Sequence, residues 1–195
     1  MNKINFKRKL ILGSANFTQK YGADLIKINL NEIKKIVKLS NKNGISLIDT
    51  ADSYLNEPTF FKNYKNKFKL VTKVKPNSKW VSLSHCKKKL DSQFKKLNKN
   101  KVQTLLFHDI KILFSNKGKK IFNNLIYLKK KKYFKKIGVS IYDTNCLSYL
   151  TKNYDLDVVQ CPFNILDKRI ISSGWFHRLK KMNIEIQARS IFLQG

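Results

Sequence analysis

Short strand-like runs alternate with longer amphipathic stretches along the whole chain. The runs recur at intervals that leave room for one helix each, at 10–13, 45–49, 68–74, 104–108, 136–140, 157–162 and 185–189. Strands joined by a helix-sized connection run parallel, because the chain must cross back over the sheet before it forms the next strand. No low-complexity linker interrupts this pattern, so we expect a single α/β domain over residues 1–195.

The connecting stretches show helix signals. Asn29 or Asn31 can cap a helix with one apolar face, which ends near Gly44. A loop through Asn16, Phe17 and Tyr21 is expected after the first strand. A helix through 97 is expected to begin at Ser82 or Ser84, and further helices are expected at 58–64, 121–128, 146–150 and 176–182.

An open doubly wound sheet and a closed barrel both fit this alternation. Polar side chains follow several successive strands, and a barrel brings such strand ends together at one mouth. We therefore expect a (β/α)8 barrel, a fold of about 250 residues with eight strands. The chain offers about seven strands, so the barrel is expected to be incomplete, without strand eight and its flanking helices. We expect a C-terminally truncated chain, either a fragment or a truncated relative.

The formal net charge of +29 could steer the chain onto nucleic acid or an acidic membrane surface. The basic residues are nearly all lysines spread along the length, whereas proteins that read phosphates and base edges rely on arginine. We therefore expect no nucleic-acid partner and no membrane association. The densest run, 129–132 with Lys135 and Lys136, is expected to be solvated between a helix and a strand. The charge would still attract a phosphorylated cofactor.

The three cysteines are Cys86, Cys146 and Cys161, which are widely separated and lack metal-ligand spacing. An odd number of separated thiols fits a reducing compartment better than a disulfide framework. No apolar run approaches membrane-spanning length. We expect a cytoplasmic protein that holds no metal and uses its cysteines for packing.

Proton-handling side chains follow three consecutive strands. The stretch GISLIDTADSY contains Asp49 and Tyr54, and Lys73 and His108 come at the ends of the next two strands. A tyrosine is a poor acid at neutral pH unless a cation favours its phenolate, and Lys73 could be that cation. Asp49 would hold Lys73 charged, and His108 would hydrogen-bond a substrate oxygen. Such a group can give a proton to a carbonyl oxygen, but it lacks a source of electrons.

Each of these residues alone also has an ordinary structural explanation. Lys73 could be a surface lysine on an edge strand, and His108 could be a core residue with satisfied hydrogen bonds. Asp49 could cap a turn, and Tyr54 could pack under a loop. We favour catalysis because the four chemical types arrive together at consecutive strand ends.

The motifs together resemble the aldo/keto reductase family. The similarity runs from about residue 10 to 195, through LILGSANF, GISLIDTADSY, VTKVKP, LLFHD, KKIGVS, DVVQCPFNILDKR and RSIFLQG. The resemblance implies a (β/α)8 barrel that reduces aldehydes or ketones with a nicotinamide cofactor. It also implies that Asp49, Tyr54, Lys73 and His108 are the catalytic tetrad, with hydride from the cofactor and the proton from Tyr54.

The resemblance further implies a set of cofactor contacts. Ser140 and Gln160 would hydrogen-bond the nicotinamide carboxamide, and Ile141 stands where the family often has asparagine. Arg189 occupies the position at which many members stack an aromatic ring on the nicotinamide, and a guanidinium can also stack. Asp49 would contribute to the same region.

Two further parts of the cofactor site are implied. Gly13 and Ser14 lie where the first strand passes the nicotinamide, although Gly13 could equally be an ordinary turn glycine. The loop that wraps the pyrophosphate would begin at 190–195 and bind through backbone N–H groups, with a plain turn as the alternative. The contacts assigned to this loop are Ser190, Phe192, Gln194 and Gly195.

The identity of the substrate is the least constrained expectation. ARSIFLQG is similar to the version found in a bacterial branch that accompanies surface-polysaccharide or nucleotide-sugar pathways, which favours a sugar-like carbonyl. We expect NADP(H) rather than NAD(H) as the cofactor. The alternative is a catalytically inert chain that acts at most as a binding protein. The oligomeric state is left open, and the aromatic residues that could line a pocket or simply pack are Phe17, Tyr21, Trp80, Phe163 and Trp175.

Overall fold

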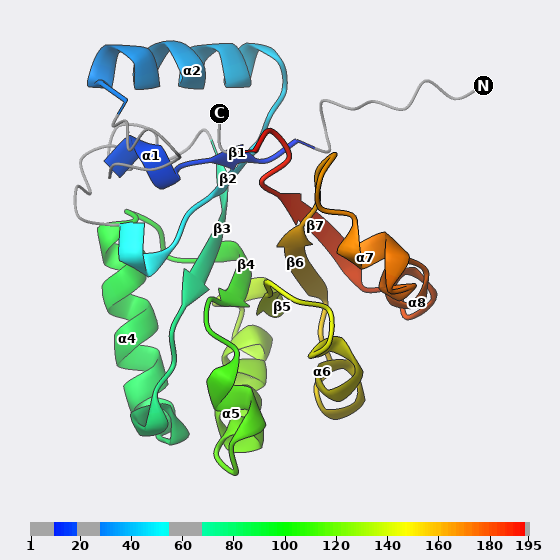
Figure 1. The fold of residues 1–195 in the computed structure, drawn as a ribbon. Helices are drawn as coiled ribbons and strands as arrows, with labels where there is room; N and C mark the ends of the chain where they lie inside the picture. Colours follow the sequence, from blue (N-terminus) through cyan, green and yellow to red (C-terminus); the bar gives the residue numbers. More distant parts are fainter. Residues whose placement is uncertain (1–9, 19–27, 55–67, 194–195) are drawn as a thin grey trace.

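The computed structural model describes residues 10–18, 28–54 and 68–193. Within these residues, parallel strands form one curved seven-stranded sheet in which each strand pairs with the next along the chain (Figure 1). A doubly wound sheet would depart from this sequential order, so the incomplete (β/α)8 barrel expected from the sequence is confirmed. The strands are β1 (Leu12–Gly13), β2 (Leu47–Asp49), β3 (Lys69–Val74), β4 (Val102–Phe107), β5 (Phe134–Ser140), β6 (Val158–Pro162) and β7 (Glu185–Arg189).

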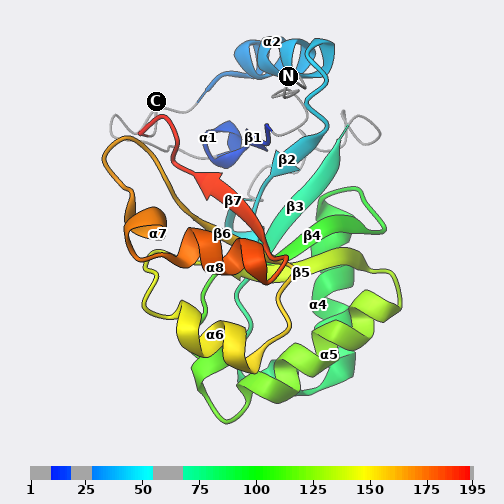
Figure 2. The same cartoon turned by 90° about the vertical axis from the view of Figure 1, so that its right-hand side faces the viewer.

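The longer helices lie outside the curve of the sheet, as the two views in Figures 1 and 2 show. The α-helices are α1 (Ala15–Thr18), α2 (Leu30–Lys42), α4 (Leu83–Lys96), α5 (Gly118–Lys130), α6 (Leu147–Asn153), α7 (Arg169–Ser172) and α8 (Trp175–Lys181). The short 3-10 helices in the described ranges are η2 (Asp52–Tyr54), η3 (Ser78–Val81) and η4 (Lys111–Phe114). The helix expected at 58–64 lies outside the described residues.

The predicted helix starts agree with the capping chemistry. The Asn29 side chain accepts a hydrogen bond from the Glu32 N–H, and the Glu32 carboxylate accepts one from the Asn29 N–H, which together form a capping box. Ser82 caps α4 in the same position. The helices α1 and α7 were not predicted, and the loop expected at Asn16 and Phe17 is wrong, because a single helical turn is too short to show a period.

Two strands are shorter than the apolar runs that predicted them. The run 10–13 gives only Leu12–Gly13, and the run 45–49 gives only Leu47–Asp49. An apolar run indicates which residues are buried. A strand extends only as far as its residues pair with a neighbouring strand, so it can be shorter than the run. The last strand, Glu185–Arg189, has the predicted bounds.

Successive strand residues alternate between two apolar clusters. Ile48 and Val159 belong to the larger cluster, which lies between the sheet and the helices. Their neighbours along the strands belong to the inner face of the curved sheet, because side chains alternate across a strand. The inner cluster consists of Val71, Leu106 and Val158, with Ile11 and Leu47 packed against it.

The lysine-rich stretch from the end of α5 to the start of β5 is not simply solvated, which corrects the expectation from sequence. Lys129 Nζ lies 2.6 and 2.7 Å from the two carboxylate oxygens of Asp157, and the same carboxylate accepts a 2.6 Å hydrogen bond from the Ile137 N–H. Lys136 forms an ion pair with Glu185. The first pair joins α5 to the residue before β6, and the second joins β5 to the first residue of β7. Part of the basic run therefore fixes the amino-terminal ends of these strands.

The remaining general features concern the cysteines and the surface. The cysteines are all free; Cys86 and Cys161 are buried, and Cys146 is half-buried. Burial raises the pKa of each thiol to about 11, so these cysteines are poor nucleophiles. Among the helices that the structure describes, none has the length and apolarity needed to cross a membrane.

Candidate active site

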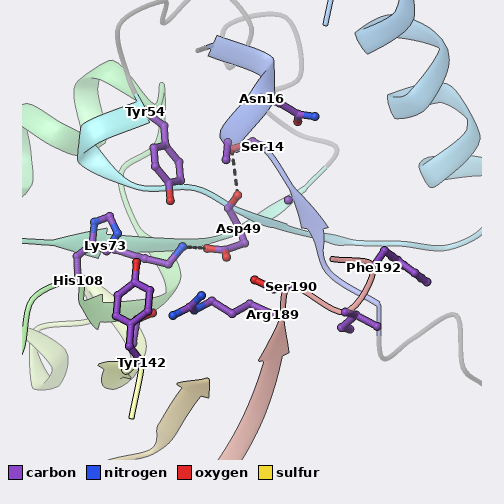
Figure 3. Close-up of a pocket in the computed structure, with 14 residues that line it drawn as sticks. Ser14, Asn16, Asp49, Tyr54, Lys73, His108, Tyr142, Arg189, Ser190 and Phe192 are labelled. Atoms are coloured by element: carbon purple, nitrogen blue, oxygen red, sulfur yellow. Dashed lines mark hydrogen bonds and ion pairs between the residues drawn. The ribbon is translucent and has the colours of Figure 1, made fainter. Parts of the chain in front are cut away.

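Polar side chains occupy the inner face of the sheet directly beyond the inner apolar cluster. Residues two positions apart on a strand face the same side, so Lys73 follows Val71 and Gln160 follows Val158. A cavity of about 420 Å³ opens at this level, which is within the range of small-molecule sites (Figure 3). The predicted residues that line it are Gly13, Ser14, Asp49, Tyr54, Lys73, His108, Ser140, Arg189, Ser190 and Phe192.

Asp49 and Lys73 form an ion pair at the centre of this cavity. The Lys73 side chain is only 4% exposed, and its ammonium also donates a 3.2 Å hydrogen bond to the Thr50 carbonyl oxygen. Burial lowers the pKa of Lys73, while the Asp49 carboxylate opposes that effect and the Arg189 guanidinium adds to it. Asp49 is therefore the group that most opposes the loss of the proton from this buried ammonium.

Tyr54 and His108 lie on the same side of the cavity as Lys73. Their ring centroids are 6.0 Å apart at an interplanar angle of 85°, and Lys73 Nζ lies 5.7 Å from the centre of the Tyr54 ring. Burial, followed by the positive charge of Lys73, lowers the pKa of His108 to about 4. His108 is therefore neutral at pH 7 and can donate a hydrogen bond without carrying a charge.

A chain of hydrogen bonds runs from β5 through β6 to β2. Ser140 Oγ donates to Gln160 Oε1 over 3.0 Å, and Gln160 Nε2 donates to Asp49 Oδ2 over 3.1 Å. Ser140 lines the cavity, whereas Gln160 is buried behind it. The two residues expected to bind a carboxamide are thus in contact with each other, and Gln160 also contacts the predicted catalytic aspartate.

Arg189 lies in the cavity on the opposite side from Tyr54 (Figure 3). Its guanidinium carbon is 4.2 Å from the centre of the Tyr142 ring, and Nη2 donates a 3.0 Å hydrogen bond to the Ile141 carbonyl oxygen. A planar cation fixed on a ring face is the geometry that stacking requires. Tyr142 also lines the cavity but was missed, because nothing in the sequence marks a tyrosine two residues past a strand end.

The segment after β7 turns tightly at the rim of the cavity. Ser190 and Leu193 have φ angles of 56° and 55°, in the left-handed region that non-glycine residues rarely adopt. The Asn164 side chain donates a 3.0 Å hydrogen bond to the Ser190 carbonyl oxygen and so holds this turn. Phe192 lines the cavity, and the predicted contacts at Gln194 and Gly195 lie outside the described residues.

The aromatic residues considered as pocket linings mostly pack instead. Phe17, Trp80 and Trp175 are buried in the larger apolar cluster. Phe163 is half-buried against the same cluster, and Tyr21 lies outside the described residues. Among the residues that the structure describes, no group of His, Cys, Asp or Glu side chains is arranged to hold a metal ion.

Comparison with family models decides the family. The model of the aldo/keto reductase family matches residues 9–195. This chain belongs to the aldo/keto reductase family. A comparison with curated protein sequences finds no match.

Solved structures of aldo/keto reductases share the fold of this chain. The Bacillus halodurans reductase in its holo form superposes with a TM-score of 0.73 at 19% identity, over 93% of this chain and 61% of that one. The NADPH complex of the silkworm Bombyx mori reductase gives 0.69 at 18% identity, over 93% and 58%. The Klebsiella pneumoniae reductase with NADP and acetate gives 0.68 at 16% identity, over 92% and 63%. This chain thus spans less than two thirds of each of these three structures.

Proposed function

We propose that this aldo/keto reductase reduces an aldehyde or ketone to an alcohol, with NADPH as the electron source and Tyr54 as the proton donor. The observation that carries the proposal is that Asp49, Tyr54, Lys73 and His108 line one cavity although they come from three separate parts of the chain. Family membership supports carbonyl reduction as the reaction class.

Tyr54 is the acid that this cavity offers. Lys73 is positioned to stabilise the phenolate that Tyr54 becomes when it gives up its proton, because an ammonium near a phenol favours the charged form. The Asp49 carboxylate favours the protonated form of Lys73 and so opposes the effect of burial. The proton passes from the Tyr54 hydroxyl to the substrate oxygen as that oxygen becomes an alkoxide.

His108 acts in this proposal as a neutral hydrogen-bond donor. With a pKa of about 4, its imidazole holds no extra proton at pH 7 and is a poor general acid. It can still donate one N–H to the substrate carbonyl, which orients the oxygen toward Tyr54 and polarises the bond. In this proposal Tyr54 transfers the proton, and His108 orients the substrate oxygen.

The residues present fit a nicotinamide ring. Gly13 lines the cavity, and a Cβ added there would meet no atom within 4 Å, so the space above the strand is open. The side chains of Ser140 and Gln160 offer hydroxyl and amide groups that complement a carboxamide, and Arg189 offers a flat cation for stacking. When bound, the reduced cofactor would supply the hydride that the side chains lack.

We propose NADPH rather than NADH, and a sugar-like carbonyl as the substrate. The net charge of +29 favours a cofactor with an additional phosphate, and the Bombyx mori structure holds NADPH. The sugar-like substrate rests on the similarity of ARSIFLQG to the polysaccharide-associated branch and on the polar groups of the lining, among them Asn16, Tyr142 and Ser190. We place the reaction in the cytoplasm, in keeping with three free thiols.

Steady-state oxidation of NADPH and of NADH against a panel of simple aldehydes, ketones and keto-sugars tests the proposal. Wild type should oxidise NADPH with at least one member of the panel, and Tyr54→Phe should lose that activity. Equal rates in the two proteins would remove Tyr54 as the acid. Cofactor binding, followed by fluorescence, separates the alternatives: tight binding without turnover in wild type would favour the binding protein over the reductase.

A further inference from the structure

We propose that Gln160 is a positioning residue for Asp49, beyond any contact it makes with a cofactor. In this role, which rests on the proposed function, Gln160 holds one carboxylate oxygen of Asp49 so that the other oxygen faces Lys73. The structure joins three groups through two contacts, from the Gln160 amide to the Asp49 carboxylate and from that carboxylate to the Lys73 ammonium.

The two oxygens of Asp49 have different partners. Oδ1 binds the Lys73 ammonium, and Oδ2 accepts the 3.1 Å hydrogen bond from Gln160 Nε2. These contacts come from opposite directions, from β3 on one side and from β6 across the inner face on the other. A carboxylate held at both oxygens cannot rotate about its terminal bond without losing one partner.

Gln160 is itself fixed by its surroundings. The residue is 2% exposed, and its Oε1 accepts the hydrogen bond from Ser140, which lies beside it in the register of β5 and β6. Because an ionised carboxylate only accepts hydrogen bonds, the amide nitrogen must be the atom that points at Asp49, with or without the Ser140 hydroxyl. The Ser140 hydrogen bond adds a second contact to Gln160, and the amide sets the orientation of the carboxylate.

A displaced carboxylate would weaken the site through Lys73. Burial already lowers the pKa of Lys73, and Asp49 is the largest opposing influence. If Asp49 turned away, Lys73 would lose its proton at a lower pH, and a neutral amine cannot stabilise the Tyr54 phenolate. Gln160 therefore supports the proton donor without touching it.

The amide can hold Asp49 and a cofactor at the same time. A glutamine side chain has two N–H groups, and the hydrogen bond to Asp49 uses one of them. The carboxamide role expected from the family and the positioning role inferred here are thus compatible, and the experiment must separate them.

Gln160→Met removes both N–H groups at a similar side-chain length, and Ser140→Ala is the matched control, because it removes a predicted carboxamide contact but leaves the Gln160 amide beside Asp49. We expect Gln160→Met to lower kcat at least tenfold and to move the alkaline limit of the kcat profile to lower pH. Ser140→Ala should mainly raise the KM for NADPH. If both variants raise only the KM and share the wild-type kcat profile, Gln160 serves the cofactor alone and the inference fails.

Gln160→Glu provides a second variant with the shape of the wild-type side chain. The introduced carboxyl group would repel Asp49 when it is ionised and would again offer a donor when it is protonated, so kcat relative to wild type should recover as the pH falls. If the kcat of Gln160→Glu relative to wild type did not change with pH, a role of Gln160 through Asp49 would be contradicted.

Crystal structures of wild type and Gln160→Met give a readout that needs no turnover. We expect the Asp49 carboxylate to rotate and the pair with Lys73 to separate beyond ~4 Å, the usual limit for an ion pair. An unchanged pair would overturn the inference even if the enzyme is an active reductase. Absence of carbonyl reduction in wild type would overturn the proposed function, and the crystal comparison would still decide the role of Gln160.

Discussion

The rings of Tyr54 and His108 meet edge to face, with centroids 6.0 Å apart at an angle of 85°. Both side chains line the cavity and can direct a hydrogen at a substrate oxygen, but they differ in what they can do at pH 7. His108, with a pKa of about 4, is neutral and can only donate a hydrogen bond. Tyr54 lies near the Lys73 ammonium and can transfer its proton.

The neutral state of His108 makes stability depend on pH. The pKa of His108 is about 4 in the folded chain, against an ordinary value of 6.5, so the unfolded chain binds more protons between these pH values. Stability should therefore fall as the pH drops from 6.5 toward 4, by at most ~1.4 kcal/mol per pH unit from this one group. Urea unfolding at pH 7 and pH 5 should show a smaller loss in His108→Gln than in wild type. An equal loss in both proteins would mean that His108 is not held neutral by the fold.

The Asp49 and Lys73 pair should behave as a buried pair in a double-variant cycle. Asp49→Asn leaves the 4% exposed Lys73 side chain without its counter-charge and should lower the unfolding free energy by about 3 kcal/mol. Asp49→Asn combined with Lys73→Met should recover a large part of that loss, because no buried charge remains. Arg169→Gln is the control, since the half-exposed pair of Arg169 with Asp167 should contribute less than about 1 kcal/mol. Additive losses in the double variant would contradict the coupling.

Gly13→Ala distinguishes the two interpretations of this glycine that the sequence leaves open. A Cβ at Gly13 would meet no atom of the protein within 4 Å, so the unfolding free energy should change by less than about 0.5 kcal/mol. If the strand passes a nicotinamide ring at this point, the same methyl group should weaken NADPH binding at least tenfold. Fluorescence titration measures this, and wild-type affinity in Gly13→Ala would identify an ordinary strand-end glycine.

Gly138→Ala is the contrasting variant for that experiment. A Cβ at Gly138 would lie 1.9 Å from the Val158 carbonyl oxygen, so β5 and β6 would have to separate. We expect it to lower the unfolding free energy by roughly 3 kcal/mol or to prevent folding. Wild-type stability in Gly138→Ala would show that the two strands do not approach as closely as the structure has them.

The order and type of the main elements could be predicted because the strand-like runs recur at helix-sized intervals and several of them carry a polar residue at the end. The convergence of Asp49, Lys73 and His108 followed from that pattern alone, since parallel strands present their carboxyl ends at one rim. The link between Gln160 and Asp49 could not be predicted, because it spans 111 residues and depends on the curvature of the sheet rather than on spacing.

Other features escaped prediction for different physical reasons. The helix Arg169–Ser172 is a single turn, too short to show a period. The pairing of Lys129 with Asp157 depends on a helix and a strand lying side by side, and a run of lysines does not indicate which member finds a carboxylate. Tyr142 lines the cavity with the Arg189 guanidinium against its ring, a contact between distant parts of the chain that the sequence does not indicate.

A single-turnover experiment tests most directly whether this cavity carries out proton-coupled carbonyl reduction. NADPH is bound first to wild type and to Tyr54→Phe, an active carbonyl from the panel is then mixed in, and the loss of reduced nicotinamide absorbance is followed by stopped flow. We expect equal NADPH affinity in the two proteins and a rate at least about 100-fold lower in Tyr54→Phe, the usual contribution of a positioned general acid. Equal single-turnover rates with saturated cofactor would contradict the account, because the proton would then come from elsewhere.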